Sequence, residues 1–171
     1  MFNRDFFINI IKILILILVQ AFVFDHIEVM GKAQPFFYLV FVLFYPPFGN
    51  RYSFLLLAFL LGLGVDFMQQ TGGIHAFSTV LVAFFRFNLL RLISGQSFDE
   101  YDRYNNYELT SFQFILMALI IIFIHHLTLF VLENFKLAHT SEVLISALFS
   151  TILTFIFVMI YKVLFKRQRA L

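Results

Sequence analysis

The sequence has no cysteine and little charge, since only 13% of its 171 residues are Asp, Glu, Lys or Arg. Without cysteine, the chain forms no disulfide, uses no thiol nucleophile and offers no thiolate to a metal ion. Soluble proteins carry charge on roughly a quarter of their residues. The shortage of charge, with 61% hydrophobic residues and a mean hydropathy of +0.91, predicts an integral membrane protein. The basic residues lie at the ends of apolar stretches and form no stripe, which argues against nucleic-acid binding.

Motifs of hydrolytic enzymes are also missing. Neither H-E-x-x-H nor G-x-S-x-G occurs in the chain. An intramembrane aspartyl protease needs two carboxylates that share a site. Asp66 is the one acidic residue inside an apolar stretch, and its context, GLGVD, differs from the G-x-G-D of those proteases. We therefore expect no enzyme activity, no catalytic residue, no cofactor and no small-molecule substrate.

Apolar stretches fill most of the chain. A membrane-spanning helix needs about 20 predominantly apolar residues. The second stretch is the weakest, because Pro35 opens it and Pro46 and Pro47 close it, which predicts a short helix that tilts little or crosses only in part. The expected fold is an all-α, six-helix transmembrane bundle in one domain, residues 1–171. Its expected spans are residues 6–24, 35–48, 53–70, 74–94, 112–132 and 142–165.

The distribution of Lys and Arg predicts the orientation, because short cytoplasmic loops carry an excess of both. One side of the membrane would carry Arg4, Arg51, Arg91, Arg103, Lys166, Arg167 and Arg169. The other side would carry only Lys32 and Lys136. Both termini are therefore expected in the cytoplasm, and all five histidines in the outer half or outer loops. Lys12, Arg86 and Lys162 lie inside spans, where we expect their side chains to snorkel to the headgroups.

Asp66 is the polar residue that most needs a partner. A carboxylate at the centre of a span costs on the order of 2.5 to 3.5 kcal/mol on insertion scales and normally turns inward. Ala58, Gly62 and Asp66 are spaced by four residues, so they share a helix face on which small residues allow close packing. His125 and His126 are expected at a comparable depth, which predicts a hydrogen-bonded pair between Asp66 and a histidine. Two roles stay open for that pair: a brace for the bundle, or a proton or ligand site.

The histidines raise the possibility of a zinc site, since imidazole is a preferred zinc ligand. His125 and His126 are neighbours on a helix, so their side chains point about 100° apart and do not readily face one ion. We therefore expect interhelical or interfacial histidines and no metal. In TGGIHAF, residues 71–77, the glycines predict a tight turn, and His75 is expected to begin the next helix.

The longest polar segment is GQSFDEYDRYNNYELTS, residues 95–111. An aromatic residue recurs there every three positions, at Phe98, Tyr101, Tyr104 and Tyr107, which is typical of a short interfacial helix. Two interpretations stay open: a connector in the headgroups, or a docking patch for a cytoplasmic partner. The basic end KRQRAL, residues 166–171, predicts a positive-inside anchor.

These features together resemble the rod shape-determining protein MreD family. The resemblance rests on QPFFYLVFVLFYPP at 34–47 and FLLGLGVDFMQQTGGIHAFSTVLVAFFR at 59–86. Within them, Gly62, Asp66, Gly73 and His75 stand at the matching positions, and HHLTLFVLENF at 125–135 is similar to a subgroup of the family. The chain departs from the pattern at Gln34, where Asn often precedes the proline, and at Phe87, where Pro often follows the arginine.

The resemblance implies a non-enzymatic scaffold of the bacterial cell-elongation machinery, which directs lateral peptidoglycan synthesis, in the inner (cytoplasmic) membrane. Such proteins associate with the bitopic protein MreC, and through it with the actin homologue MreB and with the wall synthases RodA and its penicillin-binding partner. Membrane lipid is the remaining expected contact. The candidate partner-binding or structural residues are Gly62, Asp66, Gly73, His75, His125 and His126.

A second function stays open, because the family is similar in fold to the substrate-binding subunits of energy-coupling-factor vitamin importers. Such a subunit would turn aromatic and polar groups toward a pocket at the outer side. Against it, the first span, FFINIIKILILILVQAFVF, lacks the paired small residues with which those subunits dock their energising module.

Overall fold

The computed structural model describes residues 4–29, 31, 33–46, 50–94, 109–134 and 140–165, and these residues form helices and connecting segments without a named strand. The all-α fold class is therefore confirmed. The helices are α1 (Arg4–Phe22), η1 (Phe24–His26), α2 (Leu39–Phe44), α3 (Arg51–Gln69), α4 (Ile74–Ser94), α5 (Ser111–Glu133) and α6 (Thr140–Leu164).

Within the described residues, five helical stretches are long and apolar enough to cross a membrane. They are Phe6–His26, Arg51–Gln69, Ile74–Ser94, Ser111–Glu133 and Ser141–Leu164, which agrees with five of the expected spans. Their outer surfaces carry large apolar side chains, and Phe67 is 83% exposed. Soluble monomers rarely expose apolar surface on this scale. The chain is therefore a multi-pass membrane protein.

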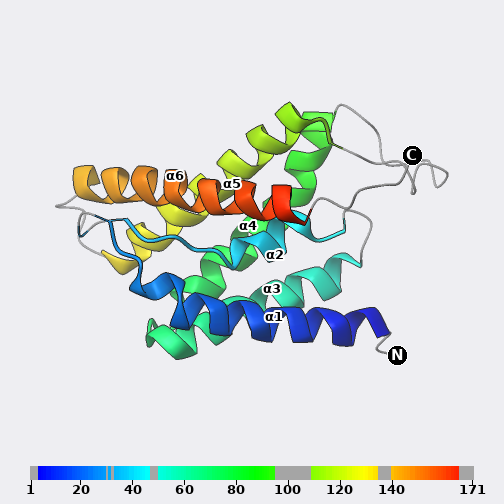
Figure 1. Ribbon diagram of the computed structural model, residues 1–171, viewed down its shortest axis with the longest axis horizontal. Coiled ribbons are helices and arrows are strands. Elements are labelled where there is room, and N and C mark those ends of the chain that lie inside the picture. Colours follow the sequence, from blue (N-terminus) through cyan, green and yellow to red (C-terminus); the bar gives the residue numbers. More distant parts are fainter. Residues whose placement is uncertain are drawn as a thin grey trace.

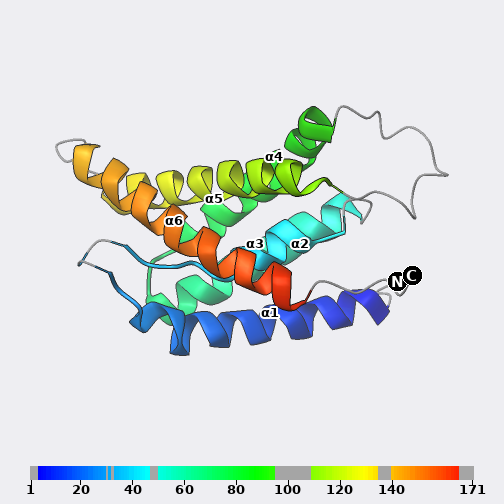
Figure 2. The ribbon, with the colours of Figure 1, turned by 45° about the horizontal axis from the view of Figure 1, so that its top comes forward.

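The long helices pack as successive neighbours. Helix α1 lies against α3, α3 against α4, α4 against α5, and α5 against α6. The start of α1 and the end of α6 lie at the same end of the bundle in both ribbon views (Figures 1 and 2). We call this the α1-start end. The turn between α3 and α4 lies at the opposite end (Figure 1).

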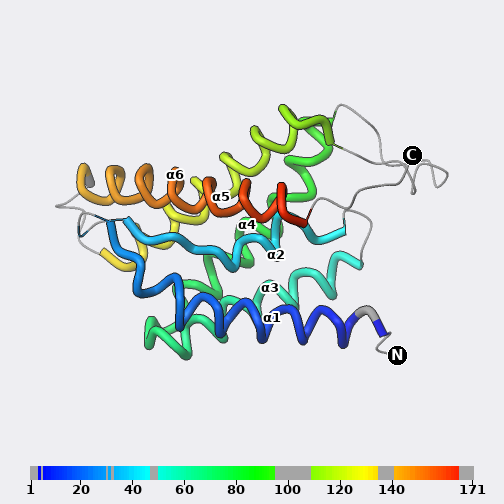
Figure 3. The backbone as a smooth tube through the Cα atoms, viewed as in Figure 1, coloured from blue at the N-terminus to red at the C-terminus, as the bar shows by residue number. Residues whose placement is uncertain are grey.

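The segment 33–46 differs from the expected second helix. Its first residues, 33–36, are non-helical, and α2 then adds only six residues before the chain leaves the helix at Tyr45 (Figure 3). The predicted short helix is confirmed, but it begins at Leu39 rather than at Pro35. Proline disfavours the helical conformation of the residue before it and donates no backbone hydrogen bond, so the chain enters this segment extended.

This segment lies in the centre of the bundle. Helix α2 contacts α1, α4, α5 and α6, and it lies between the outer helices in the tube view (Figure 3). Tyr38, Leu39 and Val42 are completely buried. Non-helical backbone is tolerated at membrane depth only where protein surrounds it. The five long helices therefore surround the segment 33–46.

The junction of α3 and α4 follows the sequence prediction. Gly72 and Gly73 have φ angles of 68° and 102°, in the left-handed region that glycine adopts without strain. Ala58, Gly62 and Asp66 are all buried on one face of α3. A Cβ atom on Gly62 would lie 2.5 Å from Ala76 Cα, so glycine is what allows α3 and α4 to approach so closely.

Candidate functional site

The Asp66 carboxylate caps the start of α4. Its Oδ1 accepts hydrogen bonds from the His75 backbone N–H at 3.0 Å and from the Thr71 hydroxyl at 2.6 Å. Its Oδ2 accepts one from the Ala76 backbone N–H at 2.8 Å. The first N–H groups of a helix have no partner within that helix, and negative charge is favoured there. Asp66 therefore joins the end of α3 to the beginning of α4.

The predicted hydrogen bond between Asp66 and a histidine of the fifth span is wrong. Both carboxylate oxygens bind the α3–α4 junction, while His125 and His126 bind other groups. The physical reason is proximity along the chain: the glycine turn brings the unpaired amides of α4 directly to the Asp66 side chain. Those amides are a sufficient partner for the carboxylate.

Two histidines meet instead at Tyr38. The Tyr38 hydroxyl lies 2.9 Å from His75 Nδ1 and 2.8 Å from His125 Nε2. A hydroxyl donates one hydrogen bond and accepts others, so one imidazole accepts from Tyr38 and the other donates to it. Tyr38 thus links the buried segment to α4 and α5. The Phe36 ring lies among three imidazoles, with centroid distances of 5.3 Å to His75, 6.0 Å to His125 and 5.1 Å to His126.

His126 belongs to a second chain of hydrogen bonds. The Phe36 backbone N–H donates to Thr154 Oγ1 at 3.0 Å, and the Thr154 hydroxyl lies 3.2 Å from His126 Nε2. His126 Nδ1 lies 2.6 Å from the Ile122 carbonyl oxygen, which only accepts. A neutral His126 with its proton on Nδ1 therefore accepts from Thr154, and every member of the chain is satisfied. As expected for neighbours on a helix, the two imidazoles point to different elements: His125 to Tyr38 and His126 to Thr154 of α6.

Further side chains satisfy the backbone at the start of the buried segment. Ser150 Oγ accepts from the Gln34 backbone N–H at 3.1 Å. Gln20 Nε2 donates to the Pro35 carbonyl oxygen at 3.1 Å and to Asp25 Oδ1 at 2.8 Å. Gln69 Nε2 of α3 donates to the same Asp25 oxygen at 2.6 Å. Helices α1 and α6 are therefore tied directly to this part of the chain, and α3 is linked to it through Asp25 and Gln20.

Arg86 serves the other end of α2, and the expectation that its side chain snorkels to the headgroups is wrong. Arg86 is buried, and its Nη2 donates to the carbonyl oxygens of Tyr45 at 2.6 Å and Leu43 at 3.3 Å. The last carbonyls of a helix lack partners within that helix, and a cation is favoured beside them. The guanidinium also lies 5.5 Å from the Phe54 ring centroid. Arg86 therefore caps α2 from α4.

Three other cations, at the start of α3 and near the ends of α4 and α6, lie over aromatic rings. Arg51 lies 4.8 Å from the Phe84 ring centroid, and Arg91 lies 5.8 Å from that of Phe87. Lys162 Nζ lies 3.8 Å from the Phe114 ring centroid. These are cation–π distances. Several sequence predictions lie outside the described residues: the segment 95–108, the basic end 166–171, and Lys32, Lys136 and His139.

The candidate residues therefore divide into two groups. Gly62, Asp66, Gly73 and the His75 backbone form the α3–α4 junction, while the imidazoles of His75, His125 and His126 surround Phe36 and Tyr38. In the described part of the chain, no three His, Asp or Glu residues are placed to hold a metal ion. The geometry favours cross-linking of helices through a shared central segment.

Sequence reasoning missed Tyr38, Gln20, Ser150 and Thr154 as members of this network. The sequence could have indicated a buried role for Ser150 and Thr154, because a spacing of four residues places both hydroxyls on one face of an apolar helix. It could not have indicated one for Tyr38, which stands in the aromatic run FFYLVF. The start of α5 could also have been predicted, because Thr110 and Gln113 form a capping box. Gln113 N–H donates to Thr110 Oγ1 at 3.3 Å, and Thr110 N–H donates to Gln113 Oε1 at 3.0 Å.

No family model matches the chain, and no curated protein or solved structure matches it at a significant level. What the chain does must therefore be inferred from its own residues.

The Thr154 hydroxyl should be important for stability. Thr154→Val leaves the Phe36 N–H buried without a partner, which costs about 1 to 3 kcal/mol. Thr151→Val is the matched control, because the Thr151 hydroxyl donates only to the Ala147 carbonyl of its own helix. We expect the midpoint of thermal unfolding in detergent to fall for Thr154→Val and to stay near wild type for Thr151→Val. Equal midpoints for the two variants would show that this bond does not hold the segment.

Proposed function

We propose that the chain is a non-enzymatic scaffold of the bacterial cell-elongation machinery, of the MreD type, that binds MreC in the inner membrane. Through MreC it would be linked to MreB, RodA and a penicillin-binding protein. The observation that carries the proposal is where the residues that resemble the MreD family lie in the structure. Gly62, Asp66, Gly73 and His75 lie together at the α3–α4 junction, where each meets a specific structural need.

The use of polar groups also supports a scaffold. The buried oxygens and nitrogens of Asp66, Thr154 and Arg86 are bonded mainly to backbone groups of other segments. Such bonds fix one arrangement of helices and leave the outer, lipid-facing surface to contact partners. A scaffold needs a rigid shape of this kind.

The importer alternative is less well supported. It requires aromatic and polar groups that face an open pocket toward the outer side. Tyr38, His75 and His125 are groups of that kind, but they are buried, and both imidazoles are hydrogen-bonded to the Tyr38 hydroxyl.

The proposed topology has six crossings, with both termini in the cytoplasm. The four residues 33–36 lie outside the helix and cover about 13 Å at ~3.3 Å per residue, and residues 45–46 add about 7 Å at the same rise. The turn at 37–38 and helix α2 add about 12 Å at ~1.5 Å per residue, because Tyr38 already has helical φ and ψ. The sum is close to the ~30 Å thickness of the hydrocarbon core. The segment 33–46 is therefore long enough to be the sixth crossing, and the α1-start end would face the cytoplasm.

The absence of cysteine makes this orientation testable with single substitutions. Ser111→Cys and Asn134→Cys place thiols at the two ends of α5, where both native side chains are exposed. In right-side-out membrane vesicles, an impermeant maleimide should label Asn134→Cys and spare Ser111→Cys. Inside-out vesicles should give the reverse. Labelling of Ser111→Cys from the outside would invert the proposed topology.

The partner assignment is tested by crosslinking the tagged protein in its native membrane and identifying co-purified proteins by mass spectrometry. We expect MreC and the wall synthases to be enriched over an untagged control. Asp66→Ala should reduce that recovery, because it releases the start of α4. Leu63→Ala, on the lipid-facing side of the same helix, should not.

A milder variant separates misfolding from lost binding. Thr71→Val removes one of the three hydrogen bonds to the Asp66 carboxylate, and the amount of each variant in the membrane is measured alongside recovery. Recovery of paired ATPases with a transmembrane coupling subunit, or absence of MreC, would contradict the scaffold. Wild-type recovery with a folded Asp66→Ala protein would contradict the role given to Asp66.

A further inference from the structure

A half-open groove lies on the side of the bundle at the α1-start end. Helices α1 and α6 form its walls, and α2 with the residues around it forms its floor. Its volume is about 390 Å³, within the ~300 to 1,000 Å³ usual for ligand pockets. Ile15 and Phe165 at its rim are exposed, so the groove opens onto the surface that faces lipid.

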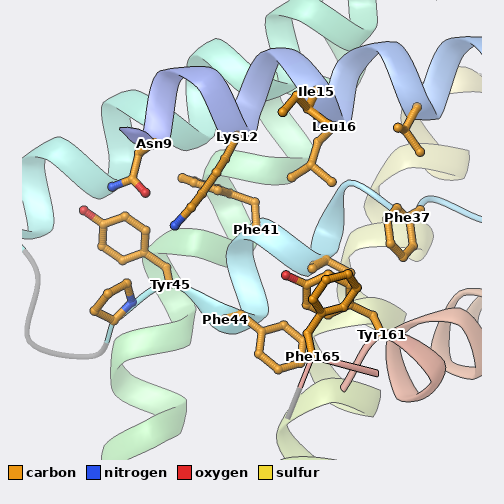
Figure 4. Close-up of a pocket in the computed structure, with 13 residues that line it drawn as sticks. Asn9, Lys12, Ile15, Leu16, Phe37, Phe41, Phe44, Tyr45, Tyr161 and Phe165 are labelled. Atoms are coloured by element: carbon orange, nitrogen blue, oxygen red, sulfur yellow. The ribbon is translucent and has the colours of Figure 1, made fainter. Parts of the chain in front are cut away.

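The lining of the groove changes character along its length. Figure 4 shows Asn9, Lys12 and Tyr45 gathered at one end of the groove. Leu16 and Phe37 lie toward the other end (Figure 4). The polar end lies nearer the beginning of α1, because Asn9 and Lys12 precede Leu16 on that helix. A ligand with a polar head and an apolar tail would fit with its head at the polar end and its tail along the apolar end.

Lys12 supplies the charge at the polar end. It lies six residues into the apolar stretch that begins at Phe6, which places its Cα about 9 Å inside that stretch. No acidic residue lines the groove, and within the described residues the Lys12 ammonium makes no hydrogen bond or ion pair. Charged groups at membrane depth normally have a partner. The groove therefore lacks the anion that would complement Lys12.

We infer that the groove binds one anionic phospholipid, with the phosphate at Lys12 and an acyl chain along Leu16 and Phe37. Basic pockets between transmembrane helices are a known mode of lipid headgroup recognition. A phospholipid supplies both the anion and the apolar tail in one molecule. A partner helix would supply an acid at this depth only rarely, because carboxylates inside spans are costly. This inference goes beyond the proposed scaffold function and does not depend on it.

The test uses the full-length protein, stripped of lipid in detergent and mixed with phosphatidylglycerol or phosphatidylcholine of identical acyl chains. Native mass spectrometry then counts the lipids that stay bound. We expect a preference for phosphatidylglycerol of at least about five-fold, as one favourable charge contact gives. Lys12→Gln should abolish the preference and Lys12→Arg should retain it. Arg91→Gln is the charge-matched control, on a helix that does not line the groove, and should behave as wild type.

A second variant tests the groove itself. Leu16→Trp fills the apolar end and should lower the binding of both lipids, while the unfolding temperature without lipid checks that the protein still folds. Equal binding of the two lipids by the wild type, or an unchanged preference in Lys12→Gln, would overturn the inference.

The occupant in the membrane is identified by a photo-reactive amino acid at position 16. A crosslinked product with the mass of a phospholipid supports the inference. A product with the transmembrane helix of another protein would overturn it.

Discussion

The constraint on which the structure depends is the need to satisfy a non-helical backbone inside an apolar bundle. Residues 33–36 lie outside the helices, and water is absent from the hydrocarbon core. The Gln34 and Phe36 N–H groups and the Pro35 carbonyl therefore bond side chains from other helices, namely Ser150 and Thr154 of α6 and Gln20 of α1, while Ala33 pairs with the Val29 backbone. Arg86 of α4 does the same for the end of α2. Several polar side chains on otherwise apolar helices therefore serve to hydrogen-bond the backbone of the central segment.

The same constraint explains how the candidate site is organised. Asp66 bonds backbone amides rather than a histidine, so the histidines are left to contact Tyr38 and Thr154. The result is a network that connects α1, α3, α4, α5 and α6 through one central segment. His125 Nδ1 and Gln20 Oε1 are exceptions, since each is buried and has no hydrogen-bond partner within the described residues. A network with so few unsatisfied atoms specifies one packing of the bundle, which suits a protein that presents a fixed surface to partners.

Hydrophobicity was enough to predict the class and the five long spans, because a stretch of about 20 apolar residues has few other folds. The glycine turn was predictable as well, since Gly72 and Gly73 are local signals. The partner of Asp66 was not, because local capping rules describe a residue adjacent to its helix, whereas Asp66 caps α4 from the end of α3. The extended course of residues 33–36 also escaped prediction, although Pro35 marked where helix formation would fail. The role of Tyr38 required the three-dimensional arrangement.

The most direct test of this account is hydrogen–deuterium exchange of the purified protein in a lipid nanodisc. The account predicts that the Gln34 and Phe36 amides exchange as slowly as those of the buried helix α5, because each donates to a hydroxyl inside the bundle. Exchange of these amides at the rate of an open loop would contradict it. The segment 33–46 would then be a mobile insertion rather than the element around which the five long helices are arranged.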